Sequence, residues 1–353
     1  MKFSLFFFAD DRSGDANPYD LLLECAQWAD RNSFHAVWTP ERHFHSFGGS
    51  YPNPSVIGAA LASLTTSIQI RAGSVVAPLH HPVRIAEEWA VVDQLSRGRT
   101  GLSFASGWHA RDFALSPDSY SSRRARTLTV ADEVRRLWRG EAVDFPDGRG
   151  ESQPIRTFPR PVQPELPVWF TSAGSPASVM DAAEAGGGLL THLLGQDLDT
   201  LGQNIERYRA GCALHHGSTT QGHVTLMLHT YVGADEGSTR EVANAPLGEY
   251  MRRSIDLASS TVPGLLPEGQ TVDTLDPEDR ELLVARAVSR YTRDNGLIGD
   301  VDRAVASLVE LQALGVDEVA CLVDFGVGPS EVLQGLDRLD LVRSEMQALA
   351  PNP

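Results

Sequence analysis

Short apolar runs alternate along most of the chain with stretches in which apolar positions recur every three or four residues. The first pattern is typical of buried strands and the second of amphipathic helices, so the chain is predicted to repeat strand, loop and helix. The predicted strands are Met1–Phe8, Phe34–Trp38, Ile68–Val76, Thr100–Ala105, Val168–Phe170, Leu189–Leu194, Val224–Val232 and Glu318–Val323. The predicted helices are Asp20–Asn32, Pro54–Leu64, Pro82 to about Leu95, Arg123–Arg139, Pro176–Ala185, Leu198–Leu214 and Val301–Leu314.

This order predicts a (β/α)8 TIM barrel, whose active site is built on the carboxyl ends of the strands. No internal sequence repeat accompanies the alternation, so residues 1–353 are interpreted as one domain. Two segments interrupt the pattern. Asp144–Pro167 is rich in proline and glycine and is interpreted as a connecting excursion, and a long insertion at about residues 235–296 precedes the last βα unit.

The insertion carries a group of arginines. An excursion of this length inside a compact barrel is usually functional or mobile. Two interpretations stay open: the arginines belong to a lid over an anionic ligand, or they lie on a solvated helical face. The arginines are Arg252, Arg253, Arg286, Arg290 and Arg293.

The composition and charge of the chain limit the classes of partner that it is expected to bind and the cellular compartment that is expected for it. The net charge of -16 opposes non-specific binding to nucleic acid or to an anionic membrane surface. No stretch approaches the roughly twenty apolar residues that cross a bilayer, and Asp10-Asp-Arg12 interrupts the amino-terminal apolar run, which we interpret as a strand and not a signal peptide. Three widely spaced cysteines, Cys25, Cys212 and Cys321, predict no disulfide framework and fit a reducing cytoplasm.

Charged and imidazole side chains crowd the end of the second predicted strand, in Thr39-Pro-Glu-Arg-His-Phe-His45. A solvated turn would explain this cluster equally well if it stood alone, but polar or glycine-rich segments follow several other predicted strands. His43 and His45 together with His80-His81 also raise the possibility of a metal ion. No His-x3-His pair on a helix or matched carboxylate set accompanies them, so no metal site is predicted.

Two further strand ends suggest a ligand. In the segment Ser103–Phe113, Gly107 precedes Trp108 at a position where a flat ring could stack, although Trp108 could equally be buried packing. The segment Thr171–Ser178 leads from the fifth predicted strand into a helix. It is interpreted either as a helix cap formed by Ser175 and Pro176 or as an anion cradle facing a phosphate.

Together these segments resemble the bacterial luciferase-like flavin monooxygenases, in particular those of natural-product biosynthesis. The resemblance covers nearly the whole chain. Its most specific motifs are Glu41-Arg-His-Phe44, Ala72-Gly-Ser-Val-Val-Ala-Pro78 with His81-Pro-Val-Arg-Ile-Ala-Glu-Glu88, Asp93-Gln-Leu-Ser-Arg-Gly-Arg99, Ser106-Gly-Trp-His109 with Asp112-Phe113, and Thr171-Ser-Ala-Gly174.

The resemblance implies a barrel that binds reduced FMN delivered by a separate flavin reductase and uses dioxygen to oxygenate a substrate, free or tethered to a carrier protein. It implies a cis peptide beneath the flavin at Gly73-Ser74, and it places Ser106 and Trp108 near the cofactor. The phosphate would sit at the loop after the fifth strand. That site comprises Ser172, Ala173, Gly174, Ser175 and Ser178.

Two positions depart from the luciferases. Arg42 and then His43 follow Glu41 where luciferases carry two histidines, and Ser106 stands where they place a phosphate-binding arginine; Arg123 or Arg124 is a candidate replacement for that cation. Aldehyde oxidation with light emission is therefore not expected.

For the present chain, His43 or His109 is expected to act as general acid or base, because imidazole titrates near neutrality. The sequence does not choose between these two histidines. Glu41 is expected to orient a neighbour.

The resemblance leaves two other functions open. A deazaflavin-dependent oxidoreductase on the same fold would transfer hydride and ignore dioxygen, and a non-catalytic flavin-binding partner subunit would resemble the second chain of a luciferase heterodimer. The populated cluster of Glu41, His43, Trp108 and His109 argues against the second of these. The resemblance also implies a homodimer formed around the second and third helices.

Overall fold

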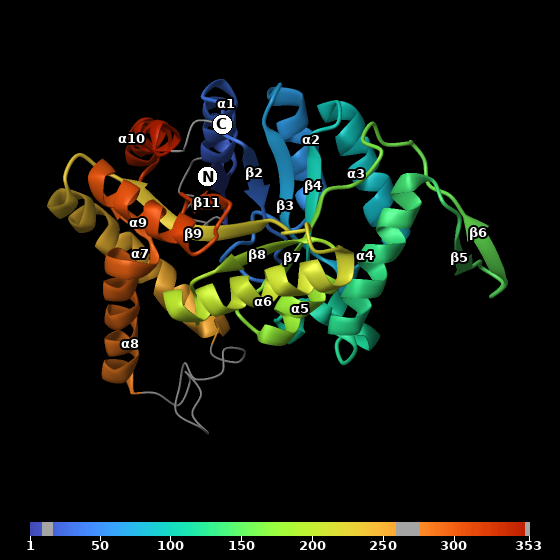
Figure 1. Cartoon of the computed structure of the whole chain (residues 1–353). Coiled ribbons are helices and arrows are strands. Elements are labelled where there is room, and N and C mark those ends of the chain that lie inside the picture. Colours follow the sequence, from blue (N-terminus) through green and yellow to red (C-terminus); the bar gives the residue numbers. More distant parts are fainter. Residues whose placement is uncertain (9–16, 259–275, 350–353) are drawn as a thin grey trace.

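The computed structural model describes residues 1–8, 17–258 and 276–349, and its main sheet closes into a parallel barrel (Figure 1). Each strand pairs with the next in chain order, and the last pairs with both β9 and β1. This confirms the predicted (β/α)8 barrel. The barrel strands are β1 (Lys2–Phe6), β2 (Ala36–Thr39), β3 (Gln69–Val76), β4 (Thr100–Ala105), β7 (Val168–Ser172), β8 (Gly188–His192), β9 (Val224–Val232) and β11 (Glu318–Leu322).

The helices that cover the barrel begin at residues suited to that role. Asn53 caps α2 by accepting from the amide of Ser55, with Pro54 at the first helical position, and Asp300 caps α9 by accepting from the amide of Arg303. No helix in the described ranges is long and apolar enough to cross a membrane. The surrounding helices are α1 (Asp20–Arg31), α2 (Pro54–Leu64), α3 (Pro82–Ser96), α4 (Arg123–Arg139), α5 (Pro176–Glu184), α6 (Leu198–His216), α9 (Val301–Ala313) and α10 (Pro329–Ala348).

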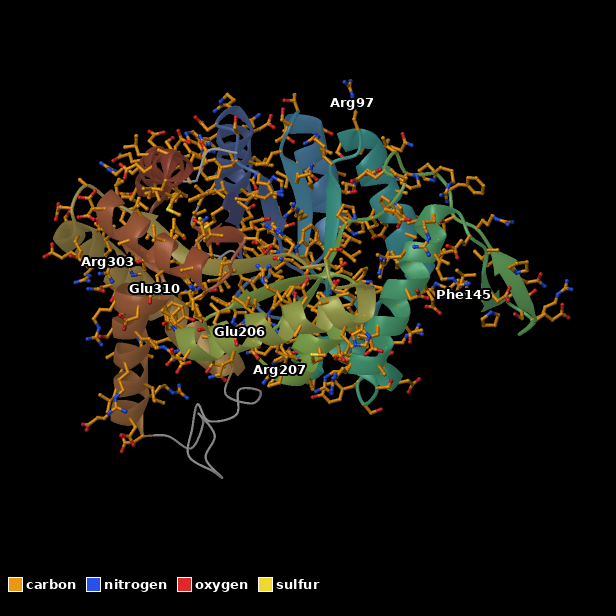
Figure 2. All side chains as sticks on the ribbon, viewed as in Figure 1. Arg97, Phe145, Glu206, Arg207, Arg303 and Glu310 are labelled. Atoms are coloured by element: carbon orange, nitrogen blue, oxygen red, sulfur yellow. The ribbon has the colours of Figure 1, made fainter. Side chains whose placement is uncertain are left out.

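The excursion expected at Asp144–Pro167 contains regular structure that the pattern did not predict. β5 (Val143–Pro146) and β6 (Ser152–Ile155) form an antiparallel hairpin that projects beyond α4 (Figure 1). Phe145 lies on this hairpin (Figure 2), and its ring lies 4.8 Å from that of His81. These strands were missed because each contains a proline and neither has a run of apolar residues.

The insertion lies between β9 and α9, as predicted. It contains α7 (Glu236–Ala258), α8 (Pro277–Arg290), a π-helical turn, η5 (Tyr291–Asn295), and a short strand, β10 (Leu297–Gly299), which pairs in parallel with β9 outside the closed barrel. α7 and α8 lie across the barrel from the β5–β6 hairpin (Figure 1). Whether residues 1–353 form a single domain stays a prediction.

The arginines of the insertion are engaged in different ways. Arg290 Nη2 donates to the backbone oxygen of Gln196, in the loop after β8, at 2.6 Å, so α8 is tied to the barrel at that point. Arg252 pairs instead with Glu281 at 2.9 Å and with Glu249 at 2.6 Å, inside the insertion itself. The charge of Arg252 is therefore matched locally, which supports the solvated-face interpretation for this residue.

A buried polar network fills the amino-terminal end of the barrel. The carboxylate of Glu318 accepts two bonds from Arg71 Nη1 at 3.0 Å and one from His223 Nε2 at 3.1 Å. The Arg71 guanidinium lies 4.9 Å from the ring centroid of Trp38 and 4.3 Å from that of Trp169. This end of a TIM barrel contributes to stability, so we assign the network a structural role.

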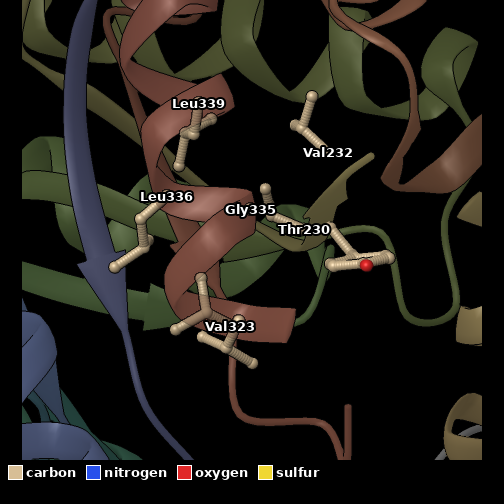
Figure 3. Close-up of a pocket in the computed structure, with 8 residues that line it drawn as sticks. Thr230, Val232, Val323, Gly335, Leu336 and Leu339 are labelled. Carbon is tan, nitrogen blue, oxygen red and sulfur yellow. The ribbon is translucent and has the colours of Figure 1, made fainter. Parts of the chain in front are cut away.

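Neither of two cavities in the described part of the chain is lined by residues that follow β2, β3, β4 or β7. One, of about 10 Å³, lies between β9 and α10 and is lined by apolar side chains, among them Val323 and Leu336 (Figure 3). This volume is close to the minimum for a single water molecule. The other, of about 490 Å³, is an open groove between α7 and α8, where Arg252 and Glu281 pair with each other.

Candidate active site

Glu41 is the centre of a hydrogen-bonded cluster at the carboxyl ends of β2 and β3. Its buried carboxylate accepts from His43 Nε2 at 2.8 Å, from His80 Nε2 at 2.6 Å and from the amide of Val76 at 2.8 Å. An ionised carboxylate only accepts hydrogen bonds, so both imidazoles carry a hydrogen on Nε2. Glu41 therefore holds two imidazoles and the end of β3 through hydrogen bonds, and its role in orienting a catalytic neighbour stays a prediction.

The Glu41 carboxylate and the His80 imidazole each favour the charged form of the other. Burial acts to raise the pKa of Glu41, but hydrogen bonds from His43 and His80 outweigh it and hold the pKa below its usual value. Burial acts to lower the pKa of His80, but the hydrogen bond and charge of Glu41 outweigh it and raise that pKa. The pair is thus stabilised as carboxylate and imidazolium.

A row of hydroxyl groups crosses the mouth of the barrel from β3 to β7. Thr171 Oγ1 lies 2.5 Å from Ser74 Oγ and 2.7 Å from Ser103 Oγ. The peptide bond between Gly73 and Ser74 is cis, as the resemblance implied. A side chain at Gly73 would meet the ring of Phe6 at 2.7 Å, so the close packing here requires glycine.

The loop after β7 has the features of an anion cradle. Ser172 Oγ lies 2.7 Å from Ser178 Oγ and accepts from the amide of Gly174 at 3.2 Å. The side chain of Ser175 does not cap α5, and Ala173 and Ser175 are both exposed. The first turn of α5 thus presents free amides and the positive end of the helix dipole at this loop.

A second layer of side chains holds the cradle in shape. Asn204 Nδ2 on α6 donates to the backbone oxygen of Gly174 at 3.0 Å and to Gln196 Oε1 at 3.2 Å. Gly174 has φ +99, and a side chain there would meet Gln196 Oε1 at 2.9 Å. Arg207, which lies on α6 (Figure 2), donates to Asn204 Oδ1 at 2.9 Å and brings a positive charge to this layer.

The two arginines considered as replacement phosphate ligands lie at the start of α4 and have other partners. Arg124 forms two hydrogen bonds with the carboxylate of Asp181, at 2.5 and 2.9 Å. Arg123 donates to the backbone oxygen of Tyr120 at 2.9 Å. Its guanidinium also lies 4.4 Å from the centroid of the Tyr120 ring. The Arg124–Asp181 pair joins α4 to α5 across 57 positions, so the sequence did not reveal it.

The segment after β4 brings three predicted residues to the same mouth. Ser106 is half-buried, Trp108 is 39% exposed, and the guanidinium of the buried Arg42 lies 5.0 Å from the Trp108 ring centroid. Gly107 has φ +72, and a side chain there would meet Val76 at 2.8 Å. His109 follows at the start of a short 3-10 helix, η2 (Ala110–Leu115).

The opposite side of the mouth is aromatic. His229, near the end of β9, lies 4.8 Å from the ring of Tyr250 on α7, 4.9 Å from Tyr291 in the π-helical turn and 5.7 Å from Phe325. Burial lowers the pKa of His229 to about 3 and that of His192 to about 4. Both imidazoles are therefore neutral near pH 7.

The structure brings most of the predicted residues together at the ends of β2, β3, β4 and β7, and adds partners that the sequence interpretation missed. His80 is among the missed residues, although its place directly after the third strand was a signal for the site. No group of His, Cys, Asp and Glu side chains in the described ranges is arranged to hold a metal ion. The added residues are His80, Ser103, Thr171, Gln196 and Asn204.

Comparison with known proteins identifies the family. The model of the luciferase-like monooxygenase family matches residues 1–318. The chain belongs to the luciferase-like monooxygenases. It is 27% identical, over 96% of its own length and 93% of the relative's, to the oxygenase component of a flavin-dependent trigonelline monooxygenase from Acinetobacter baylyi. Like that relative, this luciferase-like chain is an enzyme of the flavin-dependent monooxygenase family.

Solved structures confirm the luciferase-like fold. Monooxygenase RslO1 from Streptomyces bottropensis matches with a TM-score of 0.79 at 23% identity, covering 98% of this chain and all of that one. The oxygenating constituent of 3,6-diketocamphane monooxygenase from Pseudomonas putida, solved with FMN, matches with a TM-score of 0.77 at 17% identity, covering 96% of each chain. An F420-dependent secondary alcohol dehydrogenase matches with a TM-score of 0.73 at 19% identity, covering 98% of this chain and 99% of that one.

Proposed function

We propose that this luciferase-like enzyme is the oxygenase component of a two-component monooxygenase that takes reduced FMN from a separate flavin reductase. The observation that carries the proposal is a series of hydrogen-bonded groups on neighbouring residues that runs along the barrel mouth from Glu41 to Ser172. Glu41 bonds the amide of Val76 on β3, Ser74 of β3 bonds Thr171, and Thr171 is followed by Ser172 of the cradle. A phosphate-bearing, planar cofactor fits a site with a cradle at one end and a proton-handling cluster at the other.

The residues that would contact the cofactor have distinct roles in this proposal. The Ser172–Ser178 loop would hold the phosphate through hydroxyls and helix amides, with Arg207 behind it. Ser74, Ser106 and Trp108 would lie along the flavin ring. When bound, the reduced flavin supplies the electrons that activate dioxygen, while the protein positions the ring and excludes water.

The proposed substrate is a small organic intermediate of secondary metabolism, either free or tethered to a carrier protein. The motifs Glu41-Arg-His-Phe44 and Ser106-Gly-Trp-His109 support this class through their resemblance to biosynthetic members of the family. A cytoplasmic location is part of the same proposal.

We also propose a homodimer formed around α2 and α3. These two neighbouring helices expose large apolar side chains: Val56 is 64% exposed and Leu64 43% on α2, and Val91 is 43% exposed and Leu95 50% on α3. Several such side chains on adjacent helices are typical of a surface that another subunit covers.

An anaerobic titration of the protein with reduced FMN tests the proposed function. After saturation, the solution is mixed with aerated buffer while the absorbance spectrum is recorded. Expected are binding of reduced FMN and a transient spectrum, unlike that of either reduced or oxidised FMN, that is absent without protein. Binding of reduced F420 without any reaction with dioxygen would overturn the proposal in favour of a hydride-transferring oxidoreductase, and binding of reduced FMN without the transient spectrum would favour a non-catalytic flavin-binding partner subunit.

A further inference from the structure

Three polar side chains beside the Glu41 cluster lie close together without forming hydrogen bonds to each other. Arg42 Nη1 lies 3.8 Å from Asp112 Oδ2, and His109 Nδ1 lies 3.7 Å from Asp112 Oδ1. Four of their buried polar atoms have no hydrogen-bond partner among the residues that the structure describes. These atoms are Arg42 Nε, Arg42 Nη2, His109 Nδ1 and Asp112 Oδ1.

Such a concentration of unsatisfied buried groups requires an explanation, because each costs free energy. Arg42 is 2% exposed; its backbone amide donates to the backbone oxygen of Tyr51 at 2.9 Å, and its guanidinium lies over the ring of Trp108. Asp112 is also buried. Burial raises the pKa of Asp112 above its usual value, and the charges of Arg42 and His109 limit this rise. The Arg42 guanidinium therefore favours the carboxylate form of Asp112.

We propose that Asp112, held as an anion by Arg42, is a positioning residue that orients His109 as the proton-transferring residue of the site. This inference rests on the proposed monooxygenase function. Of the two candidate imidazoles, His43 and His109, this proposal selects His109 for proton transfer. His43 is the weaker candidate because its Nε2 already donates to Glu41, which also binds His80.

The orientation of His109 fits this role. Its Nδ1 is buried on the side of Asp112, while the side chain as a whole is 22% exposed, so the exposed part is the remainder of the ring. Closing the 3.7 Å gap lets Nδ1–H donate to Asp112 Oδ1, and hydrogen bonds of catalytic groups are often long before a ligand binds. Nε2 is then left with its lone pair facing outward and can accept a proton.

The proton balance is simple. A proton that leaves the substrate is taken up by Nε2, the imidazolium is stabilised by the carboxylate of Asp112, and the same proton returns to a product oxygen. Other charged or titratable groups also face this cluster and act on its charge. From the loop after β2 they are Glu41, His43 and His45, and from η2 Arg111.

Nitrogen NMR of the flavin-free protein, labelled with 15N in histidine, tests this inference without measuring catalysis. A His109→Gln variant assigns the His109 signals. Expected in the unchanged protein, for the neutral form of the His109 imidazole, is a hydrogen on Nδ1. In Asp112→Asn, which keeps the shape but offers an amide donor, the hydrogen should move to Nε2. The exposed His215 on α6 is the internal control and should keep its tautomer ratio.

Two outcomes would overturn the proposal: a His109 that carries its hydrogen mainly on Nε2 in the unchanged protein, or an unaltered tautomer in Asp112→Asn. If that variant does not fold, Arg42→Gln and Arg42→Lys form a second test. The glutamine variant should lose the Nδ1 preference because a buried Asp112 without a cation takes up a proton, and the lysine variant should retain it; equal behaviour of the two would contradict the inference. Failure of reduced FMN to bind, with the tautomer result intact, would reject only the proposed function.

Discussion

His80 Nε2 donates to Glu41 Oε1 at 2.6 Å, across 39 positions of the chain, and so joins the loop after β2 to the turn after β3. The two residues come from strands that are adjacent in the barrel. Because Glu41 also accepts from the amide of Val76, the carboxylate holds both the backbone end of β3 and two imidazoles. These hydrogen bonds fix the charged loop after β2 against the end of β3.

The first prediction concerns the stability of this pair at different pH values. The folded pKa of His80 is raised above its ordinary value of 6.5, so its contribution is complete below pH 6.5 and is lost as pH rises through the folded value. We expect His80→Gln to lower the free energy of unfolding by about 1 kcal/mol near pH 6, and by progressively less as pH rises.

Urea denaturation of the two proteins from pH 5 to 9 measures this difference. Glu41, whose pKa is lowered, contributes above its ordinary pKa of 4.5 and loses its contribution as pH falls, so the lower limit of the range avoids its titration. His215→Gln, at an exposed position on α6, is the control and should show no such dependence. A pH-independent effect of His80→Gln would show that the imidazole is not paired as a cation.

The second prediction concerns the amino-terminal end of the barrel. Glu318→Gln leaves the buried Arg71 guanidinium without its counter-charge and should cost about 3–5 kcal/mol of unfolding free energy. The double variant Arg71→Met with Glu318→Leu removes both charges and should cost less. Urea denaturation at pH 7 compares them, and a double variant less stable than Glu318→Gln would disprove this account. Variants that fold should bind reduced FMN unchanged, because the network lies at the other end of the strands.

The third prediction tests the phosphate cradle. Ser175→Asp places a negative charge beside the first turn of α5, where the proposed phosphate lies, and should weaken binding of reduced FMN at least tenfold, or about 1.4 kcal/mol. Anaerobic titration measures the dissociation constant. Ser218→Asp, in the loop that leads into β9 at the far end of the barrel, carries the same charge change and should bind normally. Equal affinity of the two variants would remove the loop after β7 from the site.

The fourth prediction tests the proposed dimer. Two substitutions on α3, Val91→Arg and Leu95→Arg, introduce charges into the apolar surface and should convert a dimer into a monomer. Light scattering at micromolar concentration measures the mass. Val309→Arg, at a position 46% exposed on α9, should remain dimeric. A monomeric mass for the unchanged protein would refute the proposal directly.

Local patterns in the sequence determined the barrel and showed which strand ends carry candidate functional side chains. The alternation of apolar runs and helical periodicity depends on each segment's own side chains, so it predicted the eight barrel strands within a few residues. Gly174 has φ +99, a backbone conformation that favours glycine, and this preference also depends only on the residue itself. The β5–β6 hairpin was missed because its strands lack a run of apolar residues, so no local pattern marks them.

Only the tertiary structure decided which of the charged residues meet. Arg42 and Asp112 are separated by 70 positions, Glu41 and His80 by 39, and Arg71 and Glu318 by 247, and no periodicity links these pairs. Closure of the barrel brings the ends of distant strands together, so partners depend on strand order and packing. The sequence therefore specified the chemical groups at each strand end, whereas the fold selected Glu41 as the partner of His80 and turned His109 toward Asp112.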